Sequence, residues 1–380
     1  LYGGAIQTAG SVKGKQSAKH AVSDWMDIEK QRGISVTSSV LQFNYQGKCI
    51  NILDTPGHQD FSEDTYRTLM AADCAVMVID AAKGVEAQTI KLFKVCTLRH
   101  IPIFTFVNKM DREARDPFEL MENIEEILGI KTYPMNWPIS CGKDFKGVYD
   151  RSAKRVLAFS SDGRANGVKM VDEVEAELGD AALDELIGTA NHEKLAEDIE
   201  LLDGAAEEFD LAAVQHGELS PVFFGSALTN FGVEPFLKEF LRLTPAPLPR
   251  KDAASGELVD PCSEQFSGFV FKIQANMNKN HRDRIAFLRI CSGKFERGME
   301  AFHVQEGKNI KLATGTSLMA DDRAIVSEAY AGDIIGLFDP GIFSIGDTLC
   351  TGKKHVQFAG IPTFAPEHFA RVTQVDTMKR

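Results

Sequence analysis

Residues 50–61 read INILDTPGHQDF, an apolar run that leads into an aspartate, a Pro-Gly turn and a histidine. A carboxylate such as Asp54, at the end of a buried strand, can hold Mg²⁺ directly or through water. Gly57 lets a backbone N–H approach a γ-phosphate, and His58 follows where a water-orienting group would sit. The full D-T-P-G-H string therefore points to hydrolysis at a terminal phosphate, whereas D-x-x-G alone equally describes an Asx turn with a surface histidine.

A second set of polar residues, N-K-M-D, follows the apolar run PIFTFV. Guanine presents N1–H and N2–H₂ as adjacent donors, which one fixed carboxylate such as Asp111 can accept, whereas adenine offers no such pair. Lys109 can lay its aliphatic stem over the purine, and Asn108 can brace the loop and reach the base edge. N-K-x-D also describes an ordinary turn. Its position, one strand farther along what we predict to be the same sheet as D-T-P-G-H, favours one shared nucleotide.

Two further segments are candidates for the same site. Backbone N–H groups in Ser226-Ala227-Leu228 are placed to meet guanine O6, with a small-residue turn as the alternative. Upstream, the Ser35 hydroxyl can ligate Mg²⁺ once its segment orders around the γ-phosphate, with a solvated loop as the alternative. The phosphate loop G-x-x-x-x-G-K-[ST] does not occur in the 380 residues.

Apolar runs predict the elements that position these residues. Four short apolar runs are typical of strands buried on both faces: KCINIL, CAVMVID, PIFTFVNK and PVFFGSA. Apolar residues recur at helical spacing over 86–99 and 233–243. Alternating strands and helices predict a doubly wound α/β sheet with its ligand at the carboxyl ends of the strands. After residue 262, short glycine-rich strand candidates predict a small antiparallel barrel. We therefore expect a first domain over 1–250 with an acidic insertion around 151–215, a barrel over 251–358, and the start of a third domain over 359–380.

Composition bounds the class of protein. The chain has 44% hydrophobic and 25% charged residues, with no long apolar span and no secretory signal, so we expect a cytoplasmic protein with no membrane segment. Seven widely spaced cysteines without a C-x-x-C pair argue against disulfides and zinc. The net charge is -12, but residues 171–210 hold fifteen Asp or Glu and one Lys. This acidity is local, typical of a solvated helical face, and leaves an RNA-bearing partner open.

With D-T-P-G-H, N-K-M-D, S-A-L and R-G-I-S in this order, the sequence resembles the translational GTPases. Longer strings resemble the bacterial class II peptide-chain release factor three family over essentially residues 1–380: DTPGHQDFSEDTYRTL, DWMDIEKQRGIS, NWPISCGKDFKGVYDR and FSGFVFKIQANMNKNHRDRIAFLRICSGKF. The resemblance implies a P-loop-type GTPase domain followed by the β-barrel domain that translation factors share. It places the missing phosphate loop shortly before Leu1, so we expect a chain cut at both ends that binds GTP weakly.

The resemblance also implies an activity. It implies a monomeric GTPase that binds the ribosome after peptide release, promotes dissociation of the class I release factor, and leaves after GTP hydrolysis. It assigns catalysis to His58 and Gly57 and Mg²⁺ to Ser35 and Asp54, although many relatives carry Thr in place of Ser35. The residues it assigns to GTP or GDP are Asp54, Thr55, Pro56, Gly57, His58, Asn108, Lys109, Met110, Asp111, Ser226, Ala227 and Leu228. The alternatives are an elongation-factor-G-like or ribosomal-protection GTPase or, for this chain, a non-hydrolysing scaffold that docks on the ribosome.

Overall fold

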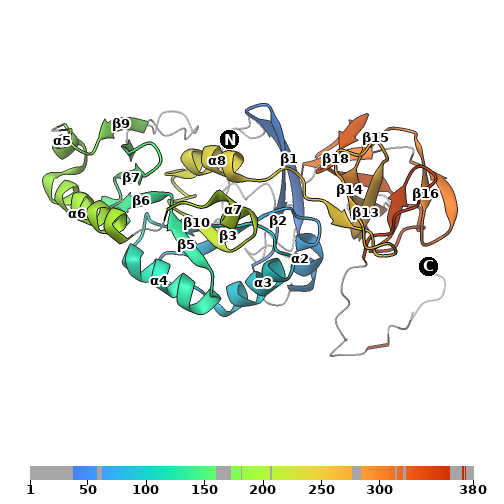
Figure 1. Ribbon diagram of the computed structural model, residues 1–380, viewed down its shortest axis with the longest axis horizontal. Helices are drawn as coiled ribbons and strands as arrows, with labels where there is room; N and C mark the ends of the chain where they lie inside the picture. Colours follow the sequence, from blue (N-terminus) through green and yellow to red (C-terminus); the bar gives the residue numbers. More distant parts are fainter. Residues whose placement is uncertain are drawn as a thin grey trace.

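The computed structural model places mixed strands and helices in one half of the molecule and strands in the other (Figure 1). The residues it describes are 37–57, 62–159, 173–180, 182–205, 208–275, 284–312, 315–319, 322–359, 370, 371 and 373. The predictions made for Ser35, His58 and most of the segment after 359 fall outside these residues.

A four-stranded parallel sheet organises the first half. Its order is β3 (Ala75–Asp80), β4 (Ile103–Asn108), β10 (Leu219–Phe224) and β5 (Lys131–Pro134). Helix α3 (Ala87–Leu98) connects β3 to β4, and the two strands pair in parallel from Ala75↔Ile103 to Asp80↔Asn108. The predicted strand-helix-strand unit is confirmed, and its strands end at one edge of the sheet.

Both faces of this sheet are covered, as the near-continuous apolar runs predict. On one face, Ile103 and Val107 of β4 pack in a cluster with residues of α3 and of α4 (Pro117–Leu128). On the other, Phe104 and Phe106 pack with residues of α7 (Leu211–Gln215) and α8 (Val233–Leu243). The doubly wound α/β prediction is confirmed.

The strand that leads into D-T-P-G does not join this sheet. β2 (Lys48–Asp54) pairs antiparallel with β1 (Ser39–Tyr45) in a separate two-stranded sheet. The prediction that D-T-P-G-H and N-K-M-D share one sheet is therefore wrong for the described residues. The physical reason is that no described strand pairs with the edge of β3 that faces away from β4.

The acidic region folds partly as strands. An antiparallel sheet is formed by β6 (Asn136–Ile139), β7 (Gly147–Asp150), β8 (Arg155–Phe159) and β9 (Glu173–Glu177), followed by α5 (Leu183–Ile187) and α6 (Thr189–Ala205). In α6, Leu195 and Ile199 are buried while Glu193 and Glu197 are exposed. The solvated acidic face is confirmed for α6, but the acidic residues of β9 belong to a strand.

The second half is an antiparallel sheet of eight strands. Their order is β17 (Lys308–Lys311), β16 (Glu300–His303), β22 (Thr348–Cys350), β13 (Ser267–Ala275), β14 (Arg284–Ser292), β21 (Ile334–Phe338), β18 (Gly315–Met319) and β19 (Asp322–Val326). Two short pairs accompany it, β15 (Lys294–Glu296) with β20 (Glu328–Tyr330) and β11 (Arg250–Lys251) with β12 (Leu258–Val259). Its core includes Phe266, Val270, Leu288 and Phe295. The barrel-type domain is confirmed, and its end strands β17 and β19 do not pair with each other.

Helix α2 (Ser62–Leu69), which follows the D-T-P-G loop in the chain, contacts the second half. Asp64 of α2 accepts hydrogen bonds from the backbone N–H and the hydroxyl of Ser38, at 2.6 and 2.5 Å. Buried Lys272 of β13 lies 3.4 Å from the same carboxylate and donates to the Ser38 carbonyl. The helix beside the candidate hydrolytic loop is thus tied to the barrel by hydrogen bonds. Within the described ranges, no helix is both long and apolar enough to cross a bilayer.

Candidate functional site

The loops after β4 and β10 are clamped together by backbone hydrogen bonds. The Gly225 N–H donates to Val107 O at 3.0 Å, and the N–H of Met110, a buried residue, donates to Gly225 O at 3.1 Å. A Cβ at Gly225 would lie 2.6 Å from Phe231 O and 2.8 Å from the Phe106 ring. Glycine is therefore required at this close approach, and it brings N-K-M-D against S-A-L.

Side chains of the two motifs complete the clamp. Asp111 Oδ1 accepts a hydrogen bond from the hydroxyl of buried Ser226 at 2.6 Å. Asn108 Oδ1 accepts from the Ala227 N–H at 2.9 Å. Because hydrogen bonds within the protein fix both side chains, the carboxylate and the amide are held in place before any ligand arrives. The structure thus brings together the two motifs that sequence reasoning assigned to guanine.

Lys109 is held in a strained conformation at the centre of this loop. Its φ of +73° lies in the left-handed region, which costs a non-glycine residue on the order of 1 kcal/mol or more. Two contacts hold it there: its N–H donates to Asn108 Oδ1 at 2.8 Å, and its ammonium pairs with Asp80 Oδ2 at 2.6 Å. Strain of this kind is typical of functional sites, where the surrounding contacts over-determine the backbone.

Asp80 is a residue of the site that the sequence motifs do not reveal. It ends β3, and its partner Lys109 lies 29 positions away in the chain. Burial acts to raise the pKa of its carboxyl, but the hydrogen bonds from Lys109 and from the Ala82 N–H, with the lysine charge, lower the pKa below its usual value. Asp80 therefore stays ionised at neutral pH and orients the Lys109 side chain.

Two of the three backbone N–H groups predicted to face guanine O6 already donate hydrogen bonds within the protein. The Ser226 N–H donates to Phe231 O at 2.9 Å, and the Ala227 N–H donates to Asn108. Leu228, which is 58% exposed, has an N–H with no hydrogen-bond acceptor in the described part of the chain. Of the three residues predicted to face O6, Leu228 therefore has the available donor.

The D-T-P-G loop leaves β2 beside α2. Asp54 is half-buried at the end of β2, followed by Thr55, and Pro56 is buried with its carbonyl accepting the Thr65 hydroxyl at 3.2 Å. Gly57 is exposed, its φ is not positive, and a Cβ built there would meet no atom of the described residues within 4 Å. The described fold therefore does not require glycine at 57, in contrast to Gly225.

This contrast yields a first prediction. Changing Gly57 to Ala is expected to leave the free energy of unfolding unchanged or slightly higher, because the site has room and alanine restricts the unfolded chain. The same change is expected to weaken GTP binding by about ten-fold relative to GDP, because a methyl group stands where the backbone would approach a γ-phosphate. Thermal unfolding and nucleotide titration check the two parts. An unchanged ratio of GTP to GDP affinity would remove Gly57 from the γ-phosphate contact.

The carboxylate of Asp54 is compatible with a Mg²⁺ site in the D-T-P-G loop. No cluster of three His, Cys, Asp or Glu side chains with ligand geometry occurs among the residues that the structure describes. Mg²⁺ in nucleotide sites usually takes one or two protein oxygens and receives the rest from phosphates and water. The single carboxylate of Asp54 fits this donor set, whereas a cage made only of protein ligands does not.

Comparison with protein families defines the class of the protein. Residues 1–246 match the Elongation factor Tu GTP binding domain, and residues 265–352 match Elongation factor G domain 2. A crystal structure of a protein from Thermus thermophilus shares the fold with a TM-score of 0.68 at 24% sequence identity, over 90% of this chain and 50% of that chain. The fold is thus that of a translation-factor GTPase.

Relatives over the whole chain narrow the class. Peptide chain release factor 3 of Symbiobacterium thermophilum is 62% identical over 379 residues, which cover 100% of this chain and 71% of the relative. Proteins of the same name from Ligilactobacillus salivarius and Listeria monocytogenes are each 55% identical, over 100% of this chain and 72% of theirs. The chain belongs to the peptide chain release factor 3 family.

Proposed function

We propose that this protein is a GTP-hydrolysing translation termination factor that promotes dissociation of class I release factors from the ribosome after peptide release. The observation that carries the proposal is the clamp of Asp111 on Ser226 and Asn108 on Ala227, found in a chain whose relatives are named release factors. The proposed partners are ribosomal RNA and protein and the class I factor, and the protein acts as a monomer in the cytoplasm. We divide the chain into a GTP-binding domain over 1–250 with an insertion around 151–215, a barrel domain over 251–358, and the start of a third domain over 359–380.

The guanine base is assigned to the clamped loops. The Asp111 carboxylate accepts from N1–H and N2–H₂ while the Ser226 hydroxyl donates to its Oδ1. The stem of Lys109 covers one face of the base, with Asp80 fixing the ammonium end. Asn108 and Met110 hold the loop, Asn108 by accepting the Ala227 N–H, and the Leu228 N–H faces O6.

The phosphates are assigned to the D-T-P-G-H loop. Asp54 and Ser35 serve Mg²⁺, which when bound neutralises charge on the phosphates. Gly57 presents its N–H to the γ-phosphate, while Thr55 and Pro56 carry the loop between strand and glycine. His58 orients the water that attacks the γ-phosphate once the ribosome has positioned it.

The open side of β3 supports an additional strand in this domain. Val76 and Val78 of β3 are 41% and 58% exposed, and Ile52 of β2 is 41% exposed. Apolar side chains exposed together are unusual on a finished domain surface. We propose that a further strand pairs with this edge of β3 and that the element beside it covers these side chains.

A second prediction tests the hydrolytic role. In the protein expressed at the length of its relatives, His58→Ala is expected to retain GTP affinity but to lower GTP hydrolysis on ribosomes by about 100-fold or more, since a positioned proton acceptor contributes that much. Single-turnover hydrolysis with and without ribosomes measures this. An unaltered rate would contradict the role of His58.

The termination role has its own test. Ribosomes that carry a fluorescent class I release factor after peptide release should lose it faster when this protein and GTP are added. If GTP is hydrolysed without release of the class I factor, the elongation-factor-G-like or ribosomal-protection alternative gains support. If the protein binds ribosomes but hydrolyses no GTP, it is a docking scaffold and the proposal fails.

A further inference from the structure

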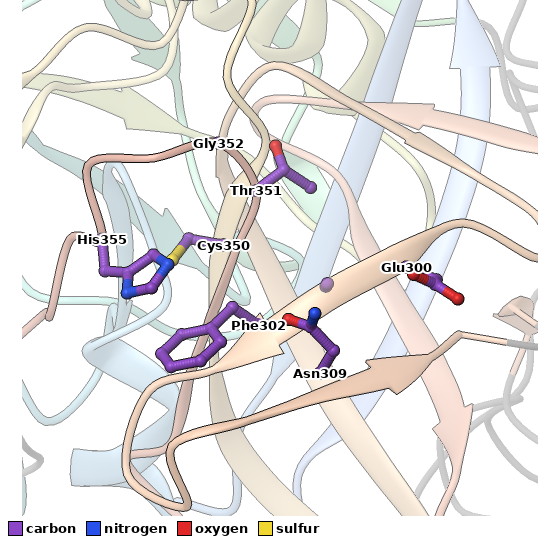
Figure 2. A pocket seen from close by; sticks show the side chains of 8 residues that line it. Glu300, Phe302, Asn309, Cys350, Thr351, Gly352 and His355 are labelled. Atoms are coloured by element: carbon purple, nitrogen blue, oxygen red, sulfur yellow. The ribbon is translucent and has the colours of Figure 1, made fainter.

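A pocket of about 420 Å³ lies on the barrel half, away from the clamped loops (Figure 2). It forms where β16 and β22 diverge, because β22 pairs with β16 only at Phe302↔Cys350 and His303↔Leu349 before the chain turns off at Thr351 and Gly352. Its volume falls within the roughly 300–1,000 Å³ typical of small-molecule sites. None of the residues assigned to GTP lines this pocket.

One wall of the pocket is an aromatic platform. The rings of Phe302 and His355 stack with centroids 3.8 Å apart and planes inclined by 14°. Phe302 is half-buried and His355 is exposed, so the imidazole is the solvent-facing ring of the stack. A flat, solvent-facing ring held by a second ring behind it suits stacking with another planar group.

The other wall carries polar groups with no partner. Along β16, Ala301 and His303 are buried and Glu300 is exposed, and Asn309 of β17 is the cross-strand partner of half-buried Phe302. Figure 2 shows the Asn309 amide and the Glu300 carboxylate on the side of the pocket away from His355. Neither side chain forms a hydrogen bond or ion pair with any residue the structure describes. An amide and a carboxylate beside a stacking surface can read the edge of a base.

Two lysines near the pocket have no ion-pair partner among the described residues. Lys311 pairs across the strands with Glu300, and Lys353 lies two residues before His355. Both lysines are exposed, and neither has a carboxylate partner in the described ranges, whereas Lys308 and Lys354 are paired with Glu306 and Glu257. Free lysines around a stacking platform match the charge of a nucleic-acid backbone.

The geometry favours RNA over a peptide. A peptide that adds to a sheet needs a free strand edge, and the edge here is β17, whereas the pocket lies at the seam between β16 and β22. An apolar side chain would leave Glu300 and Asn309 desolvated without partners, which is costly. A base can form hydrogen bonds with both side chains, so that neither its own polar edge nor Glu300 and Asn309 are left without partners.

We propose that this pocket binds one unstacked base of a single-stranded RNA segment. The base stacks on the open face of His355, Asn309 and Glu300 bond its edge, and Lys311 and Lys353 contact the flanking phosphates. Because a carboxylate only accepts hydrogen bonds, the site prefers a base whose exocyclic amino group offers two N–H donors over uracil, whose edge offers only N3–H. The proposal concerns a site separate from GTP and is tested without nucleotide.

The test uses a uridine pentamer with 2-aminopurine at its centre, titrated with the purified chain. The expected result is saturable binding with quenched 2-aminopurine fluorescence, and weaker binding of the plain uridine pentamer. His355→Ala is expected to weaken binding about ten-fold and abolish the quench, because stacking on one ring contributes about that much. His355→Tyr keeps a ring and should restore both, and Asn309→Ala should reduce the preference over uridine.

The matched control is Phe338→Ala, which removes a ring that is 63% exposed on β21, outside the pocket, and should leave binding unchanged. His355 is also exposed, so its variants are expected to fold, and circular dichroism confirms this before titration. Equal binding by wild type and His355→Ala, or no binding by wild type, would overturn the proposal. Competition by a peptide with no effect of the RNA would assign the pocket to a protein partner and overturn it as well.

Discussion

Replacing Asp111 by Asn should change which base the protein binds. The carboxylate offers two acceptors to guanine, and the amide offers one acceptor and one donor, which matches the N1–H and O2 of xanthine. Hydrogen bonds to a charged group are each worth about 1.5–3 kcal/mol, so the loss of one and the clash of donors are expected to weaken GDP binding on the order of 1,000-fold. Affinity for xanthosine diphosphate should rise by a similar factor.

The fold should survive this change. The amide oxygen of asparagine can still accept the Ser226 hydroxyl that Asp111 now accepts at 2.6 Å. Asp144→Asn is the matched control, since it removes the same charge from an exposed carboxylate in the neighbouring loop 142–144. Calorimetric titration of the wild type and of Asp111→Asn with guanosine and xanthosine diphosphates gives the four dissociation constants to be compared. Unchanged GDP affinity in Asp111→Asn would disprove the guanine assignment.

Replacing Asp73 by Asn should produce the largest loss of stability. Asp73 lies just after α2, where its carboxylate pairs with buried Arg289 and accepts the Leu248 N–H at 3.2 Å. Arg99 and Arg250 lie close enough for their charges to interact with Asp73, and burial together with the charge of Arg250 lowers the pKa of Arg99 to about 10. Asp73 is therefore the carboxylate that offsets a group of arginines in which Arg289 is buried.

Removing one partner of a buried ion pair typically costs about 3–5 kcal/mol, because the other charge is left without compensation. We expect the free energy of unfolding to fall by roughly that amount in Asp73→Asn, measured by urea denaturation. Glu86→Gln is the control, because its pair with Lys83 is exposed on both sides and is expected to contribute little to stability. Adding Arg289→Met to Asp73→Asn should recover part of the loss. Equal effects of Asp73→Asn and Glu86→Gln would show that Asp73 does not compensate the arginines.

The parts of the fold that the sequence predicts well are those with continuous apolar runs. Helix α8 occupies the predicted residues 233–243, and β2 and β4 coincide with their runs to within a residue or two. The strands β8 and β9 are not predicted from the sequence. In β9, glutamates alternate with Val174 and Ala176, and such a high density of acidic residues is also typical of the exposed face of a helix. Propensity and charge describe each segment alone, whereas strand pairing is decided by contacts between segments.

The same limit applies to the site. The motif residues Asn108, Asp111 and Ser226 carry recognisable spacing, and the structure brings them together. The pairing of Lys109 with Asp80 has no motif, because it depends on two parallel strands ending at one edge. The same is true of Asp73 and Arg289, which are 216 positions apart. The Ser226 and Ala227 N–H groups donate hydrogen bonds within the protein, and this too can be recognised only in the folded loop.

The most direct test of the central claim, a guanine site formed by the clamped loops, is photo-crosslinking with 6-thioguanosine diphosphate, whose reactive sulfur replaces O6. The protein is expressed at the length of its relatives, irradiated with the bound nucleotide, and digested for peptide mapping by mass spectrometry. The account predicts that the cross-link lies within residues 226–228, next to the available Leu228 N–H, and that unlabelled GDP but not ADP prevents it. A cross-link that maps elsewhere, such as to the barrel pocket at His355, or one that ADP prevents equally, would contradict it.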